Sequence, residues 1–324
     1  MNELPKEATD QTDRGVRDLI TAVSRVSAWH DSAIEYEKVT GGITNENFKV
    51  RADGATFFVK IPGSGTEAFI DRANCHVANQ IAAEVGIGPA VAHFFPDTGV
   101  EIFDWLDGYR TMNWGDVYDN DVFLGTADLI RKFQTFEDLQ MPLVQTAFEQ
   151  TFEMIRMARE MGTYLPPEMD RMEYLAHQIE AAVERGGIEY RPCHNDYYSM
   201  NILIHERTGE LKLVDYEYAS MNDECYDMGV YSGANYFTEE MDVMFIKRRY
   251  GGWDEERFAR LKLYKLLADI KWSMWALVQD RIATVRFDYF NWFGTKMARL
   301  RGNSLDPRID YWLNLVGRTG RLNA

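Results

Sequence analysis

The chain has 324 residues, and the 46% that are hydrophobic are enough to build substantial cores in one large or two modest domains. Its formal net charge of −16 argues against nucleic acid or anionic membranes as partners and favours a cation near any acidic cleft, although such a charge also serves solubility alone. The cysteines, Cys75, Cys193 and Cys225, form neither a paired framework nor a spaced metal set, so we expect no disulfide. The polar start resembles no signal sequence and no run of about eighteen apolar residues occurs, which predicts a cytoplasmic protein without membrane insertion.

The first part of the chain predicts a small β-rich lobe. Apolar residues between Val16 and Trp29 recur at helical spacing, which indicates an amphipathic helix behind a mobile tail of about a dozen residues. From Ile34 to Ile61 the pattern becomes strand, turn, strand, turn, strand, with glycines at both turns. Helical character returns from Thr66 to Val85, and two further short strands follow.

The rest of the chain is predicted to be mainly helical. The segments LIRKFQTF, FEMIRMAR, MEYLAHQIEAAV and Glu255–Asp280 all show apolar positions three and four apart. The exception is ILIHERTGELKLVDYEY, which predicts a hairpin that turns at Thr208-Gly209 and whose far strand carries Asp215. We therefore predict a two-lobed α+β architecture, divided into residues 1–106 and residues 107–324, with EIFDWLDG (Glu101–Gly108) as the connector between the lobes.

One loop before this hairpin carries residues suited to phosphoryl transfer. His194, Asp196 and Asn201 follow the pattern H-x-D-x-x-x-x-N, and Asp215 ends the hairpin. Phosphoryl transfer needs a carboxylate that orients the attacking hydroxyl and accepts its proton, together with hard oxygen ligands for magnesium. Each residue alone is more simply a turn residue that satisfies the local backbone, but the joint pattern is specific.

These residues resemble the choline/ethanolamine kinase family, within the wider group of aminoglycoside phosphotransferases and protein kinases. HNDYYSMNILI is similar to the catalytic loop of that family and LVDYEYASMNDECYDMG to its metal-binding segment, and the resemblance spans nearly the whole chain. It implies a protein-kinase-like fold and ATP and Mg²⁺ as cofactors. It also implies catalytic roles for Asp196, as the base, and for His194, and magnesium ligands at Asn201 and Asp215. Glu217 is then expected near the metal or substrate, and Asp227 as a structural anchor of the loop.

The β-rich lobe carries a matching phosphate-binding pattern. VTGGITNENFKV resembles the family's glycine-containing loop, which implies nucleotide contacts from Gly41, Gly42, Thr44 and Asn45. Gly41-Gly42 alone is equally explained by a hairpin turn. Lys60, one strand later, corresponds to the lysine that contacts the α- and β-phosphates, and EIFDWLDG resembles the hinge that pairs with adenine.

One position departs from the family pattern. The family's lysine is held by a glutamate on the following helix, and Cys75 occupies that position here. A buried thiol supplies no fixed negative charge at neutral pH. We therefore expect Lys60 to be oriented by Glu67, by a neutral His76 or by the phosphates. The departure also leaves open a non-catalytic, nucleotide-binding member of the family.

The acceptor is predicted to be a small cationic alcohol. Trp272 and Trp275 lie three apart on the long C-terminal helix, resembling the W-x-x-W helix of choline kinases, and VRFDYFNWFG brings Tyr289 near another family aromatic. A trimethylammonium group donates no ordinary hydrogen bond, so aromatic faces and carboxylates such as Glu217 are what recognise it. Tryptophans on such a helix can equally be core residues. Ethanolamine, thiamine or an amino sugar remain alternative acceptors, and the oligomeric state stays open.

Overall fold

The structure is a computed structural model that describes residues 1–9, 12–40, 45–63, 66, 70–138, 140–283 and 287–318. Its first part contains β1 (Asn2–Glu3), α1 (Arg14–Ser24), β2 (Glu35–Val39), β3 (Glu46–Ala52), β4 (Ala55–Ile61), α2 (Arg72–Glu84), β5 (Val91–Phe95) and β6 (Val100–Asp104). The second part begins with β7 (Tyr109–Thr111), α3 (Trp114–Val117), α4 (Asn120–Gln134), α5 (Ala147–Glu160) and α6 (Met169–Gly186). It continues with β8 (Tyr190–Cys193), β9 (Ile202–His205), β10 (Leu211–Leu213), β11 (Ser220–Asp223), α7 (Tyr226–Ala234), α8 (Glu239–Tyr250), α9 (Glu255–Ile282), α10 (Tyr289–Asn303) and α11 (Ile309–Val316). Short 3₁₀ helices lie at Ser27–Trp29 and Ser199–Asn201.

One lobe is built on a six-stranded antiparallel sheet in the order β1-β2-β3-β4-β6-β5. The predicted meander is confirmed, and its β3–β4 turn consists of Asp53 and Gly54, both with positive φ (49° and 74°). A two-residue turn with this backbone matches the twist of the flanking strands, which explains the Asp-Gly sequence. The buried side of the sheet packs against α1 in a core that includes Leu19, Phe48 and Val59.

The N-terminal tail is more ordered than the sequence predicts. Asn2 and Glu3 pair with Tyr36 and Glu35 at the edge of the sheet, and Leu4 joins the core beneath it. A polar composition does not reveal such edge pairing, because the bonds are made by the backbone.

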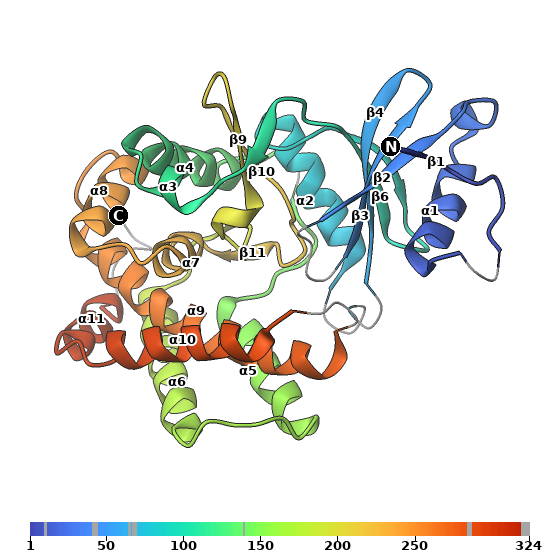
Figure 1. The fold of residues 1–324 in the computed structure, drawn as a ribbon. Coiled ribbons are helices and arrows are strands. Elements are labelled where there is room, and N and C mark those ends of the chain that lie inside the picture. The colour runs from blue at the N-terminus through green and yellow to red at the C-terminus, as the bar shows by residue number, and fades with distance from the viewer. Residues whose placement is uncertain are drawn as a thin grey trace.

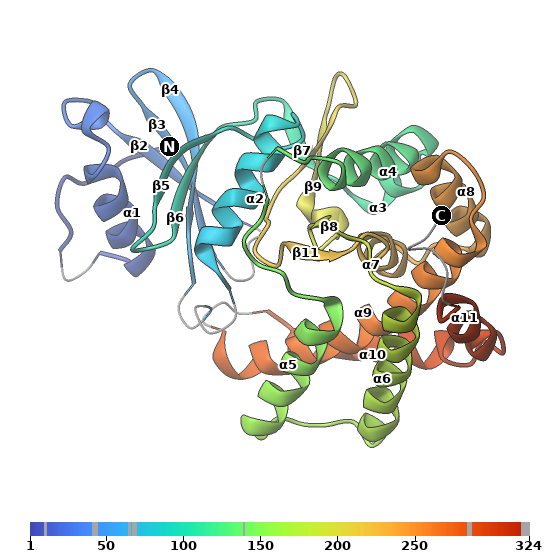
Figure 2. The same cartoon turned by 180° about the vertical axis from the view of Figure 1, so that it is seen from behind.

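Helix α2 lies between the sheet and the helical lobe in both views (Figures 1 and 2). It begins at Arg72, later than the predicted start at Thr66, and Asp71 caps it by accepting a hydrogen bond from the Asn74 N–H. Its side chains at Ala78 and Ile81 belong to the core of the helical lobe rather than to that of the sheet. The helix therefore ties the two lobes together.

The second lobe is mainly helical, and the predicted α+β class is confirmed. Helices α9 and α10 run side by side, with α5 packed on α9 (Figure 1). Most of the 28 residues of α9 are buried, around its whole circumference, as in a helix that passes through the centre of a domain. The predicted hairpin forms as β9 and β10, but β10 ends at Leu213, so Asp215 follows the strand instead of lying on it. No helix among the described residues combines the length and apolarity needed to cross a membrane.

Candidate active site

The loop that follows β8 is held by a buried carboxylate. The backbone N–H groups of His194 and Asn195 donate to the two oxygens of Asp227, at 3.0 and 2.7 Å, as expected for a structural anchor. Asn195 has a left-handed backbone (φ 64°), and its side-chain amide donates to the carbonyl of Tyr218 at 2.8 Å and to the hydroxyl of Ser220 at 2.7 Å. These bonds fix the backbone directly before Asp196.

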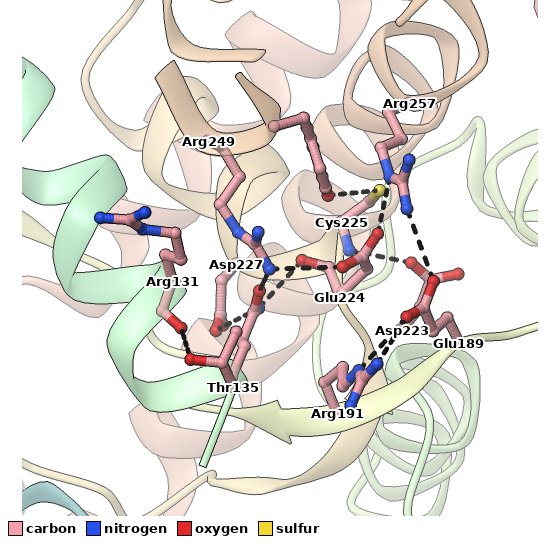
Figure 3. A network of polar contacts seen from close by, with 12 residues as sticks. Arg131, Thr135, Glu189, Arg191, Asp223, Glu224, Cys225, Asp227, Arg249 and Arg257 are labelled. Atoms are coloured by element: carbon pink, nitrogen blue, oxygen red, sulfur yellow. Dashed lines mark hydrogen bonds and ion pairs between the residues drawn. The ribbon is translucent and has the colours of Figure 1, made fainter. Parts of the chain in front are cut away.

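A second layer of charges supports the anchor from behind (Figure 3). The Gln134 amide donates to Asp227 at 3.4 Å and to the Glu224 carbonyl at 2.9 Å, while its oxygen accepts from Arg249 at 2.8 Å. The Glu224 carboxylate is paired with Arg257 at 2.7 Å and with Arg249 at 3.3 Å. Each charged group of this network therefore has a partner of opposite sign or a hydrogen bond.

Asp196 points into a cavity and is bound to Asn201. The Asn201 amide donates to the Asp196 carbonyl at 2.9 Å and to its carboxylate at 3.1 Å. Burial, together with the negative charge of Asp215, raises the pKa of Asp196 to about 7, although Lys271 lowers it. A carboxylate with this pKa is suited to accept a proton near neutral pH.

His194 is engaged on both ring nitrogens. Its Nδ1 accepts a hydrogen bond from the Asp196 N–H at 3.2 Å, so its Nε2 carries the proton and donates to the Val214 carbonyl at 3.0 Å. Burial lowers the pKa of His194 to about 3, which keeps the ring neutral. These bonds suit a positioning residue better than the catalytic role expected from the sequence.

Lys60 is held by two carboxylates of the segment after β10. Its Nζ lies 2.5 Å from Asp215 Oδ1 and 3.2 Å from Glu217 Oε1. Burial alone would lower the pKa of Lys60, but the two negative charges raise it above its ordinary value. Glu217 also accepts hydrogen bonds from Arg72 at 2.7 Å and from the Asn45 amide at 2.9 Å. Burial would raise the pKa of Glu217, but the charges of Lys60 and Arg72, with these hydrogen bonds, hold it at about 2.

This arrangement answers the question raised by Cys75. The Cys75 thiol is buried and donates to the backbone carbonyl of Glu217 at 3.5 Å. At the helix position where the family has a glutamate, this chain therefore has a thiol that binds the segment carrying Glu217. His76 binds Glu101 at 3.0 Å, so the expectation that His76 orients Lys60 is wrong. Glu67 lies outside the described residues, as do Gly41, Gly42 and Thr44.

The cavity between the lobes has a volume of about 520 Å³. Apolar side chains of its lining include Phe58, Phe103, Leu106, Leu203 and Val214. Asp196, Asn201, Asp215 and Lys60 line the same cavity. The predicted base, magnesium ligands and lysine therefore share one cavity with a surface suited to a flat apolar ring.

Aromatic rings of the helical lobe also line the cavity. Both predicted tryptophans of α9 line it, together with Tyr198, Tyr218 and Trp292, which the sequence argument did not select. The Trp275 indole donates to the Tyr218 hydroxyl at 2.5 Å. Tyr289 is absent from the described lining; its ring packs against Trp275, 6.0 Å away between centroids. We call Tyr198, Tyr218, Trp272, Trp275 and Trp292 the aromatic box.

The side chains fit a magnesium ion bound with phosphates. Asn201 and Asp215 offer an amide and a carboxylate oxygen in the same cavity, and magnesium needs only one or two protein oxygens when phosphates and water complete its shell. No cluster of three or more His, Cys, Asp or Glu side chains suited to a metal occurs among the described residues. Magnesium would therefore depend on the nucleotide as much as on the protein.

The model of the choline/ethanolamine kinase family matches residues 36–249. The chain belongs to this family. It is similar to the probable choline kinase 2 of Arabidopsis thaliana, with 24% identity over 322 residues that cover 86% of this chain and 89% of that protein. It is similar to the probable ethanolamine kinase of the same plant, with 26% identity over 298 residues and coverage of 81% and 78%. The crystal structure of a choline/ethanolamine kinase family protein from Mesorhizobium loti superposes with a TM-score of 0.76 at 25% identity, covering 92% and 96% of the two chains.

Two expectations from the sequence are thereby confirmed. The fold is the two-lobed protein-kinase-like fold, and the chain is an ATP-dependent phosphotransferase. The matched range ends before α9, so the family model does not cover Trp272 and Trp275.

Proposed function

We propose that this enzyme transfers the γ-phosphate of ATP to the hydroxyl of choline or a related amino alcohol. The supporting observation is that one cavity holds Asp196, Asp215 and the aromatic box. Aromatic faces attract organic cations through the ring quadrupole, and Trp is the best of them. A small alcohol with a nitrogen group at its other end can therefore place its hydroxyl at Asp196 and its nitrogen against the rings.

The proposed chemistry is an in-line displacement. The acceptor oxygen attacks the γ-phosphorus, the bond to the β–γ bridging oxygen breaks, and the hydroxyl proton passes to Asp196. Lys60, positioned by Glu217, would contact the phosphates, and Phe103 and Leu106 offer apolar surface for the adenine. Asn201 and Asp215 would hold magnesium, which would neutralise charge on the phosphates.

We also propose that the lobes divide near residue 106. The six-stranded sheet ends at Asp104, and the next strand, β7, pairs with β9 of the helical lobe. The segment between them lines the cavity through Trp105 and Leu106, as a connector that binds the nucleotide would.

Two alternatives to this proposal concern the identity of the acceptor and a non-catalytic role. Ethanolamine is as well supported by similarity as choline, since relatives of both names have comparable identity, and thiamine or an amino sugar would use the same machinery. A non-catalytic role rested on Cys75 alone, and the ion pair between Lys60 and Glu217 removes that support.

The decisive experiment is ATP turnover with a panel of alcohols. Choline, dimethylethanolamine, ethanolamine, thiamine and an amino sugar are compared as acceptors with ATP and magnesium, and the phosphorylated product is detected directly. We expect the highest kcat/KM with one of the first three. Failure of all three would overturn the proposal.

The metal assignment has a separate test. Asp215→Asn should weaken ATP binding about tenfold when magnesium is present and much less without it, because the substitution removes one anionic ligand. Binding is measured by calorimetry with and without EDTA. An equal loss in both conditions would show that Asp215 acts through Lys60 and not through the metal.

A further inference from the structure

Two buried lysines lie against the rings of the aromatic box. The Lys296 ammonium, on α10, is 4.0 Å from the Trp292 ring centroid and 4.7 Å from that of Tyr198. The Lys271 ammonium, on α9, is 4.4 Å from the Trp272 centroid and 4.9 Å from that of Tyr218. All four rings line the cavity, whereas neither lysine belongs to its described lining.

The charges around these lysines do not neutralise them completely. Lys271 donates to the neutral amide of Gln150 at 2.6 Å, and the carboxylates that act on it are Asp196 and Asp227. Asp227 is already engaged by two backbone N–H groups of the catalytic loop. Burial lowers the pKa of Lys271 to about 7.

Lys296 lies in a similar environment. The charged groups that act on it are Arg299 of its own helix, Asp269 of α9 and Asp196 of the catalytic loop. Asp269 accepts hydrogen bonds from the Arg299 Nε at 2.9 Å, so its charge is largely used by that pair. Burial and the Arg299 charge lower the pKa of Lys296 to about 7.

A cation already in contact with a ring changes what the other side of that ring binds. The ring quadrupole attracts a second cation, but two like charges separated by one ring repel each other, and the apolar, buried surroundings screen them weakly. An uncharged group of the same shape keeps the dispersion and burial terms and meets no repulsion. The box is therefore less favourable to cations than its rings alone suggest.

We propose that Lys271 and Lys296 are specificity-determining residues that disfavour a permanent cation in the aromatic box while they are protonated. The inference rests on the proposed function, because it concerns the acceptor of that same site. It implies that the enzyme discriminates against quaternary ammonium alcohols and prefers acceptors whose nitrogen can bind uncharged. Removing either lysine should then improve the binding of choline.

The test uses two ligands that differ only in charge. Choline and its neutral isostere 3,3-dimethylbutan-1-ol are titrated by calorimetry into the enzyme with a non-hydrolysable ATP analogue, at pH 6. The proteins are the wild type, Lys271→Met and Lys296→Met. We expect the wild type to bind the isostere at least as tightly as choline. Each variant should bind choline about threefold to thirtyfold more tightly, with less than about twofold change for the isostere.

Lys265→Met is the matched control. Lys265 is also a buried lysine of α9, but its ammonium pairs with Asp242 at 3.2 Å, away from the cavity. It should leave the affinities for both ligands unchanged. Melting curves identify a variant that does not fold, in which case Lys271→Gln and Lys296→Gln replace it.

The outcomes separate the two proposals. Unchanged or weaker choline binding in both folded lysine variants would overturn this inference, as would a wild type that binds choline more than about tenfold better than the isostere. Because binding is measured without turnover, a wild type that phosphorylates no amino alcohol overturns the proposed function while the effect of the lysines is still measured.

Discussion

Two buried charge clusters meet at the catalytic loop, and they are built from different cations. Behind the loop, arginines match carboxylates directly: Arg260 lies 2.5 Å from Asp223, and Arg257 lies 2.7 Å from Glu224. On the cavity side, Lys271 is bonded to a neutral amide and Lys296 lies against aromatic rings. One cluster pairs its charges, and the other leaves them partly unmatched.

The difference affects which groups titrate near neutral pH. Burial brings the pKa of Asp196, Lys271 and Lys296 to about 7 in each case. Arginine keeps its charge in a buried site, whereas lysine and carboxylates shift readily. Arg257 and Arg260, paired with carboxylates, therefore support the loop from behind, whereas Asp196 lines the cavity and Lys271 and Lys296 lie against its rings, as is common for groups of shifted pKa at active sites.

The largest expected effect lies on the cavity side. Asp196→Asn should lower kcat by at least ~10²-fold, since a positioned general base is lost, while ATP affinity stays nearly unchanged. Its melting temperature at pH 8 should be equal to or higher than that of the wild type, because the stability that a buried acid loses as the pH rises from its ordinary pKa of 3.8 through its raised pKa of about 7 is already lost at pH 8. Asp97→Asn, an exposed aspartate that pairs with Arg25 outside the cavity lining, is the control with full activity. Near wild-type turnover of Asp196→Asn would rule out Asp196 as the general base.

Breaking the arginine cluster should lower stability and leave kcat unchanged, the opposite of what we expect for Asp196→Asn. Arg260→Met leaves Asp223 charged and unpaired in the interior, which should cost about 3–5 kcal/mol of unfolding free energy. The folded fraction should keep the wild-type kcat. Denaturant titration measures the loss, and the double variant with Asp223→Asn should recover part of it. A stable variant with a reduced kcat would show that the cluster takes part in catalysis.

The pH dependence of kcat/KM tests which group on the cavity side titrates during catalysis. If Asp196 acts as the base, it must be ionised, so kcat/KM should fall as the pH decreases below about 7, and at pH 6 it should be about tenfold below its plateau. His194 does not titrate in this window, since its pKa is about 3. The profile is measured from pH 5.5 to 8.5. A flat profile in that range would contradict the role of Asp196.

The smallest effect concerns Trp292 and Tyr289, two of the aromatic side chains of α10. Trp292→Leu should raise the KM for the accepted amino alcohol about twofold to thirtyfold, the range of one cation–π or ring contact, with the KM for ATP unchanged. Tyr289→Leu should raise it less, because Tyr289 packs behind Trp275. Steady-state kinetics and melting temperatures distinguish binding from stability. A larger increase in KM for Tyr289→Leu than for Trp292→Leu would indicate that Tyr289 contacts the acceptor.

Local rules in the sequence predicted more of the fold than of the site. The Asp53-Gly54 turn and the long helix from Glu255 follow from backbone preference and periodicity, which short segments carry. The partner of Lys60 could not be found in this way, because Glu217 comes from the opposite lobe and reaches it only in the folded chain. Trp292 and Tyr289 are three residues apart, so helical spacing alone cannot decide which of them lines the cavity.

The expected mobile tail and the glycine loop illustrate two further limits of prediction from the sequence. The pairing of Asn2 with Tyr36 depends on backbone bonds at a sheet edge, which side-chain patterns do not report. The predicted contacts of Gly41 and Gly42 fall outside the described residues and stay predictions.

The left-handed backbone of Asp215 (φ 72°) limits which residues can replace it during evolution. Glycine, asparagine and aspartate accept this conformation with little strain, whereas other side chains, β-branched ones above all, clash with the backbone. Of these three only aspartate brings an anionic oxygen. A sequence that drifts at this position therefore passes through asparagine or glycine, which preserve the chain path but lose the charge, before any other residue becomes tolerable. Loss of catalysis at this position would thus leave a folded, nucleotide-sized cavity behind.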